Sequence, residues 1–204
     1  MLPVLAVRDA QLEDADVLVR LWGQMSAGIG QSRLLAAPSP ATARAAIARM
    51  ATEPSARLIV GELAGEVCAL AYLRRTPISP LHDEDTVTVE YLHVNDEARR
   101  HGVGHALIAA AAAWAEEKDS QHVAVFAPAG ERESNRFLAR RGLGQAGVVR
   151  FASTHTVRRR LAADQSPNLI ALLAARRTAL ARRTAMIRAR TPVIPPAAPE
   201  STGT

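Results

Sequence analysis

Residues 89–104 read VEYLHVNDEARRHGVG and combine an expected strand, a short loop and an Arg-x-x-Gly-x-Gly turn. An Ala-rich segment of high helix propensity follows the turn at once. Gly102 and Gly104 let a ligand approach the backbone with no Cβ in the way. The first N–H groups of a helix lack intrahelical partners and lie at the positive end of its dipole, so they attract anions. The turn therefore predicts a binding site for a phosphate or pyrophosphate group.

Two other phosphate-binding patterns are excluded by the sequence. A dinucleotide-binding fold has Gly-x-Gly-x-x-Gly near its first strand and an acidic residue about 20 positions later. A P-loop has a glycine followed by Lys and then Ser or Thr. This chain has neither pattern, and Lys118, its only lysine, is far from any glycine pair. A different phosphorylated cofactor is therefore expected.

Arg99-x-x-Gly102-x-Gly104, after a strand with a central carboxylate, resembles the coenzyme A signature of the GCN5-related N-acetyltransferase (GNAT) superfamily. Three other segments are similar to elements of that family in the same order. Residues 7–15 resemble its first strand and helix, residues 62–67 the hairpin of its second and third strands, and residues 136–143 the helix that ends in Gly-Phe. The resemblance extends over roughly residues 4–160.

The hydrophobic patterns and the resemblance together predict a mixed α/β (α+β) fold. Expected strands cover residues 4–9, 57–63, 66–75, 86–94 and 123–127, and expected helices cover residues 13–25, 40–52, 105–118 and 132–141. The resemblance implies a mostly antiparallel central sheet with helices on both faces and with its fourth and fifth strands splayed apart. Residues 148–161 are predicted to form one bent strand or a tight hairpin.

The resemblance implies that acetyl-CoA (coenzyme A) is the cofactor, used as a co-substrate. The expected phosphate cradle consists of Arg99, Arg100, His101, Gly102, Val103, Gly104 and His105. By the same resemblance, the backbone of Leu92, His93 and Val94 pairs with the pantetheine arm and polarises the thioester carbonyl. The histidines show no spacing typical of a zinc site, so no metal is predicted.

Glu90 is the predicted general base. Strand alternation places Val89 and Tyr91 on one face and Glu90 on the other. A carboxylate in a central strand is unfavourable unless it is paired or used, and one that is partly removed from water is well suited to taking a proton from an ammonium group. The alternatives are an ion pair with a neighbouring arginine and a strand edge that faces outward.

The chain departs from the family at the general acid. Family members usually place a Tyr four residues before the terminal glycine of the helix, where it protonates the leaving thiolate; this chain has Leu138 there. The family's cofactor-binding Asn is matched by Glu131, and Asn135, one turn later, is predicted to supply part of that contact. Water is then the expected proton source for the thiolate. Tyr72, one of the two tyrosines of the chain, lies on the strand that precedes the one with Glu90.

Charge is distributed unevenly along the chain. The net charge is +5 overall, but residues 158–204 contain nine of the 25 Lys and Arg residues and only two of the 20 acidic residues. The remaining part of the chain is slightly acidic, so a globally basic, nucleic-acid-coating domain is not indicated. We expect an acetyl-CoA-binding domain at 1–162, an Arg/Ala-rich helical extension at 163–190 and a Pro-rich disordered tail at 191–204.

The sequence limits the environment and the partners of the protein. Cys68 is the single cysteine, which excludes an internal disulfide framework. No apolar run approaches the ~20 residues that span a bilayer, and the N-terminus lacks a secretory signal pattern, so a soluble cytoplasmic protein with no membrane partner is expected. The basic extension is interpreted as a solvated helix, a homodimer-bridging helix or a contact for nucleic acid or a protein partner.

The leading functional prediction is an acetyl-CoA-dependent N-acetyltransferase. It would transfer the acetyl group to a small-molecule or peptide amine by direct attack in a ternary complex. The alternative is a catalytically weak acyl-CoA-binding regulatory protein whose basic tail contacts nucleic acid or a partner. The sequence does not identify the amine acceptor.

Overall fold

The computed structural model describes residues 4–28, 36–128, 130–150 and 152–164. The chain divides into two compact units, Met1–Gly147 and Val148–Thr204. Within the described residues, the first unit holds the sheet and four α-helices, and the second holds the single helix α5, Thr154–Asp164.

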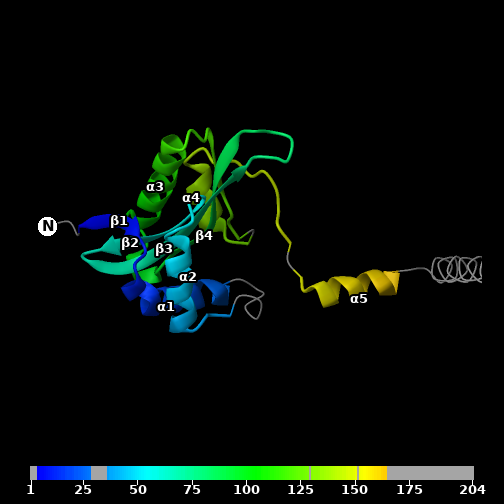
Figure 1. Cartoon of the computed structure of the whole chain (residues 1–204), viewed down its shortest axis with the longest axis horizontal. Coiled ribbons are helices and arrows are strands. Elements are labelled where there is room, and N and C mark those ends of the chain that lie inside the picture. Colours follow the sequence, from blue (N-terminus) through cyan, green and yellow to red (C-terminus); the bar gives the residue numbers. More distant parts are fainter. Residues whose placement is uncertain (1–3, 29–35, 129, 151, 165–204) are drawn as a thin grey trace, which may run out of the picture. The chain divides into compact units, whose positions relative to one another are not determined.

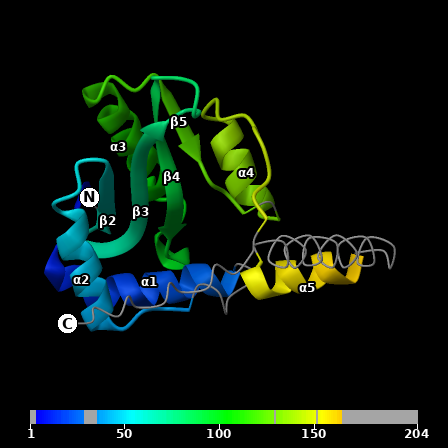
Figure 2. The same ribbon diagram turned by 45° about the vertical axis from the view of Figure 1, so that its right-hand side comes forward.

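The first unit is built on a five-stranded sheet in the order β1-β2-β3-β4-β5 (Figure 1). Its strands are β1 (Leu5–Asp9), β2 (Ala56–Leu63), β3 (Glu66–Pro77), β4 (Asp85–Val94) and β5 (His122–Val125). The first four strands pair antiparallel with their neighbours, and β5 pairs parallel with β4. β5 pairs only with Thr86–Val89 of β4, and the two strands then diverge (Figure 2). The predicted fold class, including the splayed fourth and fifth strands, is confirmed.

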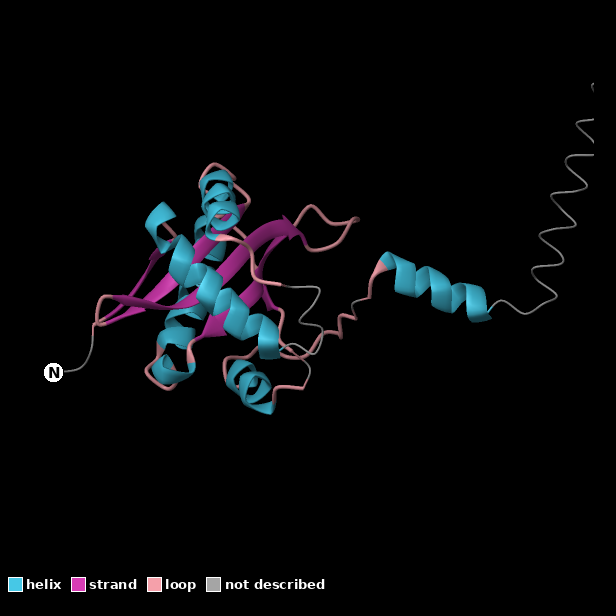
Figure 3. Ribbon diagram, turned by 90° about the horizontal axis from the view of Figure 1, so that it is seen from below, coloured by secondary structure: helices cyan, strands magenta, loops and turns pink. Residues whose placement is uncertain are grey.

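Helices lie on both faces of this sheet (Figure 3). The helices are α1 (Ala15–Gly28), α2 (Pro40–Met50), α3 (Val103–Glu117) and α4 (Arg132–Ala139), and the short 3-10 helices are η1 (Leu12–Asp14) and η3 (Asp96–Ala98). Ser39 begins α2, since its hydroxyl accepts the N–H of Thr42 and Pro40 follows at the first helical position. The expected helices and strands of this unit are all present, with ends that differ by a few residues.

Two apolar clusters hold the layers together. The cluster on the α3 side combines strand residues with α3 and α4, including Val87, Val89, Leu107, Trp114 and Leu138. The cluster on the opposite face lies between the sheet and α1 and α2, and includes Leu18, Leu21, Ile47, Val60 and Leu70. Few aromatic residues take part, so close packing of Ala, Val and Leu carries most of the burial.

A glycine in β2 lets α3 lie close to the sheet. A Cβ added at Gly61 would lie 2.7 Å from Cγ1 of Val103 and 3.2 Å from Cβ of Ala69. Val103 is the first residue of α3, and it is 1% exposed. The absence of a side chain at Gly61 therefore sets how close the start of α3 comes to β2.

The prediction of a bent strand or hairpin at residues 148–161 is wrong. The described residues from 144 to 153 form no regular element, and Thr154–Asp164 forms α5. The β-branched residues of this segment favoured a strand, but Ser153 accepts the N–H of Thr156 through its hydroxyl at 3.1 Å and starts a helix instead. Beyond Asp164, the predicted Arg/Ala-rich extension and the Pro-rich tail lie outside the described residues.

None of the helices in the described part of the chain is both long and apolar enough to span a membrane.

Candidate cofactor and acceptor site

The predicted phosphate turn leads directly from η3 into α3. Its backbone has two residues of positive φ, Arg100 at 65° and Gly102 at 87°. Ala106 donates its N–H to the carbonyl oxygen of Gly102 at 3.0 Å, which closes the first turn of α3. No side chain caps this helix start. The N–H groups that precede Ala106 therefore have no intrahelical acceptor, as an anion site at a helix start requires.

The side chains of three predicted cradle residues make different contacts at the turn. The guanidinium of Arg99 forms an ion pair with Asp96 at 2.9 Å, and that of Arg100 forms one with Glu133 of α4 at 3.6 Å. His101 contacts the carbonyl oxygen of Arg99 through Nδ1 at 2.9 Å. The structure thus brings these basic side chains to the turn, and their binding of phosphate remains a prediction.

Beyond Val89, β4 continues with one free edge. β3 pairs with β4 up to Val94, whereas β5 is paired with it only as far as Val89. Within the described residues, the β5-facing edge of Leu92, His93 and Val94 therefore has no strand partner. Unpaired backbone groups on such an edge are available to an extended ligand. The expected pantetheine contact has the geometry it needs and remains a prediction.

The side chains of these three strand residues point to both faces. Leu92 and Val94 pack against the cluster on the α3 side. His93 lies on the α1 face, where its Nε2 is 3.3 Å from Oε1 of Gln24. Burial, followed by the charge of Arg99, lowers the pKa of His93 below its usual value. A lowered pKa favours the neutral imidazole, which retains a proton-accepting nitrogen.

Glu90 is the extra residue of a β-bulge in β4. Tyr72 pairs with Tyr91 and Leu73 pairs with Val89, so no residue of β3 lies opposite Glu90 in the backbone register. Its side chain is 23% exposed, and its Oε1 lies 3.3 Å from Nη1 of Arg74. The ion pair with a neighbouring arginine is thus present, and the catalytic role of Glu90 remains a prediction.

The expectation that Tyr91 faces away from Glu90 is wrong, because the bulge interrupts the alternation of β4. Val89 belongs to the α3-side cluster, but Tyr91 packs against the cluster under α1 and α2. The ring centroid of Tyr91 lies 4.9 Å from that of Trp22 on α1 and 6.4 Å from that of Tyr72 on β3. We call these three residues the aromatic group.

The aromatic group lies beside the Arg74–Glu90 ion pair. Burial raises the pKa of Tyr72; the charge of Arg74 lowers it and the charge of Glu90 raises it, both by less than burial does. The chain has only two Trp, two Tyr and three Phe, so three rings at one place are a strong local concentration. Sequence reasoning missed this group because its members come from three elements and depend on the bulge.

Comparisons with known proteins agree with this geometry. The profile described as "Acetyltransferase (GNAT) family" matches residues 30–144, more than half of the chain. The chain belongs to the GNAT acetyltransferase family. Acetyl-CoA-dependent acetyl transfer is the general activity that this membership indicates. A comparison with curated proteins gives no significant match.

Several solved structures share the GNAT fold with this chain. A transcriptional regulator from Bacillus halodurans superposes with a TM-score of 0.62 at 18% identity, covering 74% of this chain and 99% of that one. An aminoglycoside N-acetyltransferase in complex with CoA gives 0.60 at 16% identity, covering 74% and 95%. A ribosomal-protein-alanine N-acetyltransferase from Brucella melitensis gives 0.56 at 20% identity, covering 73% and 100%. At these identities the likeness shows a common fold.

In GNAT proteins the helix that corresponds to α4 usually supplies the general acid. Here Leu138 occupies that position and packs into the core. Leu138 is 7% exposed and belongs to the α3-side core. Asn135 donates its side-chain N–H groups to the carbonyl oxygens of Pro128 at 3.1 Å and Glu131 at 2.8 Å. Asn135 therefore connects Pro128 and Glu131 to the first turn of α4. Because its side-chain N–H groups are used in these bonds, its predicted contact with the cofactor would be made by the amide oxygen.

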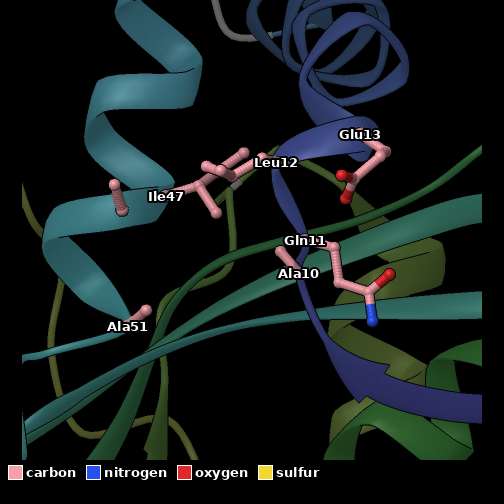
Figure 4. Close-up of a pocket in the computed structure, with 7 residues that line it drawn as sticks. Ala10, Gln11, Leu12, Glu13, Ile47 and Ala51 are labelled. Carbon is pink, nitrogen blue, oxygen red and sulfur yellow. The ribbon is translucent and has the colours of Figure 1, made fainter.

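Two open hollows lie away from the turn of this GNAT domain. One, of about 360 Å³, is formed by η1 and α2 around Leu12 and Ile47 (Figure 4). The other, of about 410 Å³, includes Trp114 and Lys118 at the opposite end of α3 from the phosphate turn. Neither contains a predicted site residue. Among the described residues, no group of three or more His, Cys, Asp and Glu side chains is arranged to hold a metal ion.

Proposed function

We propose that this GNAT protein binds acetyl-CoA and transfers its acetyl group to an amine. The observation that carries the proposal is the uncapped start of α3, reached through a turn with positive φ at Arg100 and Gly102. The backbone N–H groups there, together with the helix dipole, bind the phosphates of the cofactor. The free edge of β4 at Leu92–Val94 leads from the turn toward Glu90 and accommodates the pantetheine arm.

The reaction needs one base and one electrophilic carbonyl. The carboxylate of Glu90, directly or through water, takes a proton from the acceptor ammonium. The neutral amine nitrogen attacks the thioester carbonyl carbon, and a C–N bond forms while the oxygen bears negative charge. Backbone N–H groups of β4 beyond the bulge stabilise that oxygen. The C–S bond then breaks as the carbonyl re-forms. The nitrogen gives its second proton to water, and the thiolate takes a proton from water because Leu138 offers none.

The neighbourhood of Glu90 supports an amine acceptor. The aminoglycoside and ribosomal-protein-alanine N-acetyltransferases that share the fold are named for amine acceptors. In this chain, Glu90 and the aromatic group lie on the same face, where a carboxylate and π-faces favour a cationic ligand. The acceptor is a small molecule or a peptide with a free amine.

Two measurements test this function. Isothermal titration should show binding of acetyl-CoA, and release of thiol in the presence of a panel of amines should show transfer. The Glu90→Gln variant should bind acetyl-CoA as the wild type does and release thiol at least about 100-fold more slowly, since a positioned base contributes about 10²–10⁴-fold. Glu116→Gln, at an exposed position of α3, is the matched control and should keep full activity.

The results separate the two predicted functions. Transfer that is unchanged in Glu90→Gln would remove Glu90 from the mechanism. Binding of acetyl-CoA without thiol release for any amine would favour the regulatory alternative, which the burial of Leu138 and the Arg74–Glu90 ion pair also favour. Absence of binding would contradict both functions.

A further inference from the structure

We infer that Arg141 is a phosphate-binding residue of the cofactor site. It belongs to the segment that follows α4, outside the turn that the sequence motif identifies. The inference rests on the proposed function, because the anion is a phosphate group of coenzyme A. It adds a side chain that selects the nucleotide end of the cofactor.

Three contacts hold the guanidinium of Arg141 in place. It stacks on the ring of Phe137, with Cζ 3.6 Å from the ring centroid. Its Nη1 donates to the carbonyl oxygen of Phe137 at 2.8 Å, and its Nε donates to Nδ1 of His105 at 3.3 Å. A guanidinium fixed in this way loses little conformational freedom when a ligand binds.

These contacts place the cation beside the anion-attracting start of α3. His105 is the third residue of that helix. The Phe137 ring, on which the guanidinium stacks, lies 3.5 Å from the Cβ position of Gly104. Arg141 and the uncapped N–H groups of α3 therefore carry positive charge within the same small region. Positive groups so close repel each other unless an anion lies between them.

Arg141 differs from the two arginines of the motif in its partners. Arg99 and Arg100 each form an ion pair with a carboxylate, Asp96 and Glu133 respectively. Over the described residues, Arg141 forms no such ion pair; its hydrogen bonds go to the carbonyl oxygen of Phe137 and to Nδ1 of His105. No described protein atom accepts a hydrogen bond from its Nη2. Its charge and part of its hydrogen-bonding fork are thus available to a phosphate.

The arrangement gives Arg141 a specific task. The backbone N–H groups of the turn bind one phosphate without using a charged side chain, whereas Arg141 adds a full positive charge and directional donors. Loss of a charge-assisted hydrogen bond of this kind weakens binding by about 10-fold or more. Replacement of Arg141 should therefore reduce affinity for coenzyme A without altering the reacting end of the cofactor.

The test compares Arg141→Gln with Arg140→Gln by isothermal titration of coenzyme A and of 3′-dephospho-coenzyme A. Arg140 is the adjacent exposed arginine, and no ion pair of the described residues involves it, so it is a matched control for charge. We expect Arg141→Gln to lose about 10-fold or more in affinity for coenzyme A and Arg140→Gln to stay within about 2-fold. Arg141→Lys, which keeps the charge without the planar fork, should be intermediate.

The two ligands identify which phosphate Arg141 contacts. A loss that disappears with 3′-dephospho-coenzyme A supports contact with the 3′-phosphate, and an equal loss with both ligands supports contact with the pyrophosphate. Wild-type affinity in Arg141→Gln, or an equal loss in Arg140→Gln, overturns the inference while leaving the proposed function intact. Absence of coenzyme A binding by the wild type overturns the proposed function and this inference together. Far-UV circular dichroism confirms the fold of each variant, and Arg141→Lys gives the test if Arg141→Gln does not fold.

Discussion

Replacement of Gly61 by Ala tests how the sheet positions the phosphate turn. The added Cβ would lie 2.7 Å from Cγ1 of Val103, where carbon atoms normally approach to about 3.5–4.0 Å. Val103 is 1% exposed and Ala69, the second neighbour, is fully buried, so neither side chain can move into solvent. Overpacking of this kind costs about 1–3 kcal/mol, and the reduced freedom of the unfolded chain offsets about 0.4–1 kcal/mol. We expect a net loss of about 1–2 kcal/mol in the free energy of unfolding.

Urea unfolding followed by tryptophan fluorescence measures this loss, because Trp22 and Trp114 both lie in the first unit. Gly144→Ala is the control, since in the described part of the chain no atom beyond its two chain neighbours lies within 4 Å of the added Cβ. In a Val103→Ala background the closest contact is gone and only the contact with Ala69 remains, so Gly61→Ala should cost clearly less. An unchanged unfolding midpoint for Gly61→Ala, or an equal loss in both backgrounds, would refute the role assigned to Gly61.

Two further predictions concern buried side chains. The hydrogen bonds from Arg8 lower the pKa of Asp14 below its ordinary value of 3.8, so the stability they provide is present above that value and lost as the pH falls through the lower, folded pKa. Asp14→Asn should therefore lower the free energy of unfolding by about 1–3 kcal/mol at pH 7, and urea unfolding near pH 3 should show a smaller difference. Leu138→Tyr should lower the free energy of unfolding by about 2 kcal/mol or more without raising the rate of thiol release, because the hydroxyl enters a filled core. An unchanged unfolding midpoint with faster thiol release would show that the Tyr reaches the thiolate.

The geometry of the candidate phosphate turn could be predicted from the sequence because its requirements are local. A strand, two glycines and a helix in direct succession specify the turn, and α3 begins within two residues of the predicted position. The prediction of a strand or hairpin at residues 148–161 is wrong for a local reason as well. Its Val and Thr residues favour a strand, whereas the hydroxyl of Ser153 caps a helix at the same place. Two local preferences competed there, and the sequence offered no third signal to decide between them.

The surroundings of Glu90 could not be predicted from the sequence because one bulge controls them. Strict alternation would put Tyr91 with Val87 and Val89 in the α3-side core and separate it from Glu90. The extra residue at Glu90 turns Tyr91 to the α1 face, where it meets Trp22 and Tyr72.

The same bulge leaves Glu90 without an opposite residue in the backbone register of β3, at the point where β5 diverges from β4. The positions of the base candidate and of the aromatic group therefore depend on a single irregularity of register. Deletion of Glu90 would remove the extra residue, return Tyr91 to the core face and separate it from Trp22 and Tyr72. The deletion therefore removes both the carboxylate and the contacts of the aromatic group, whereas Glu90→Gln keeps the register and removes only the charge. Comparison of the two variants separates the role of the bulge from that of the carboxylate.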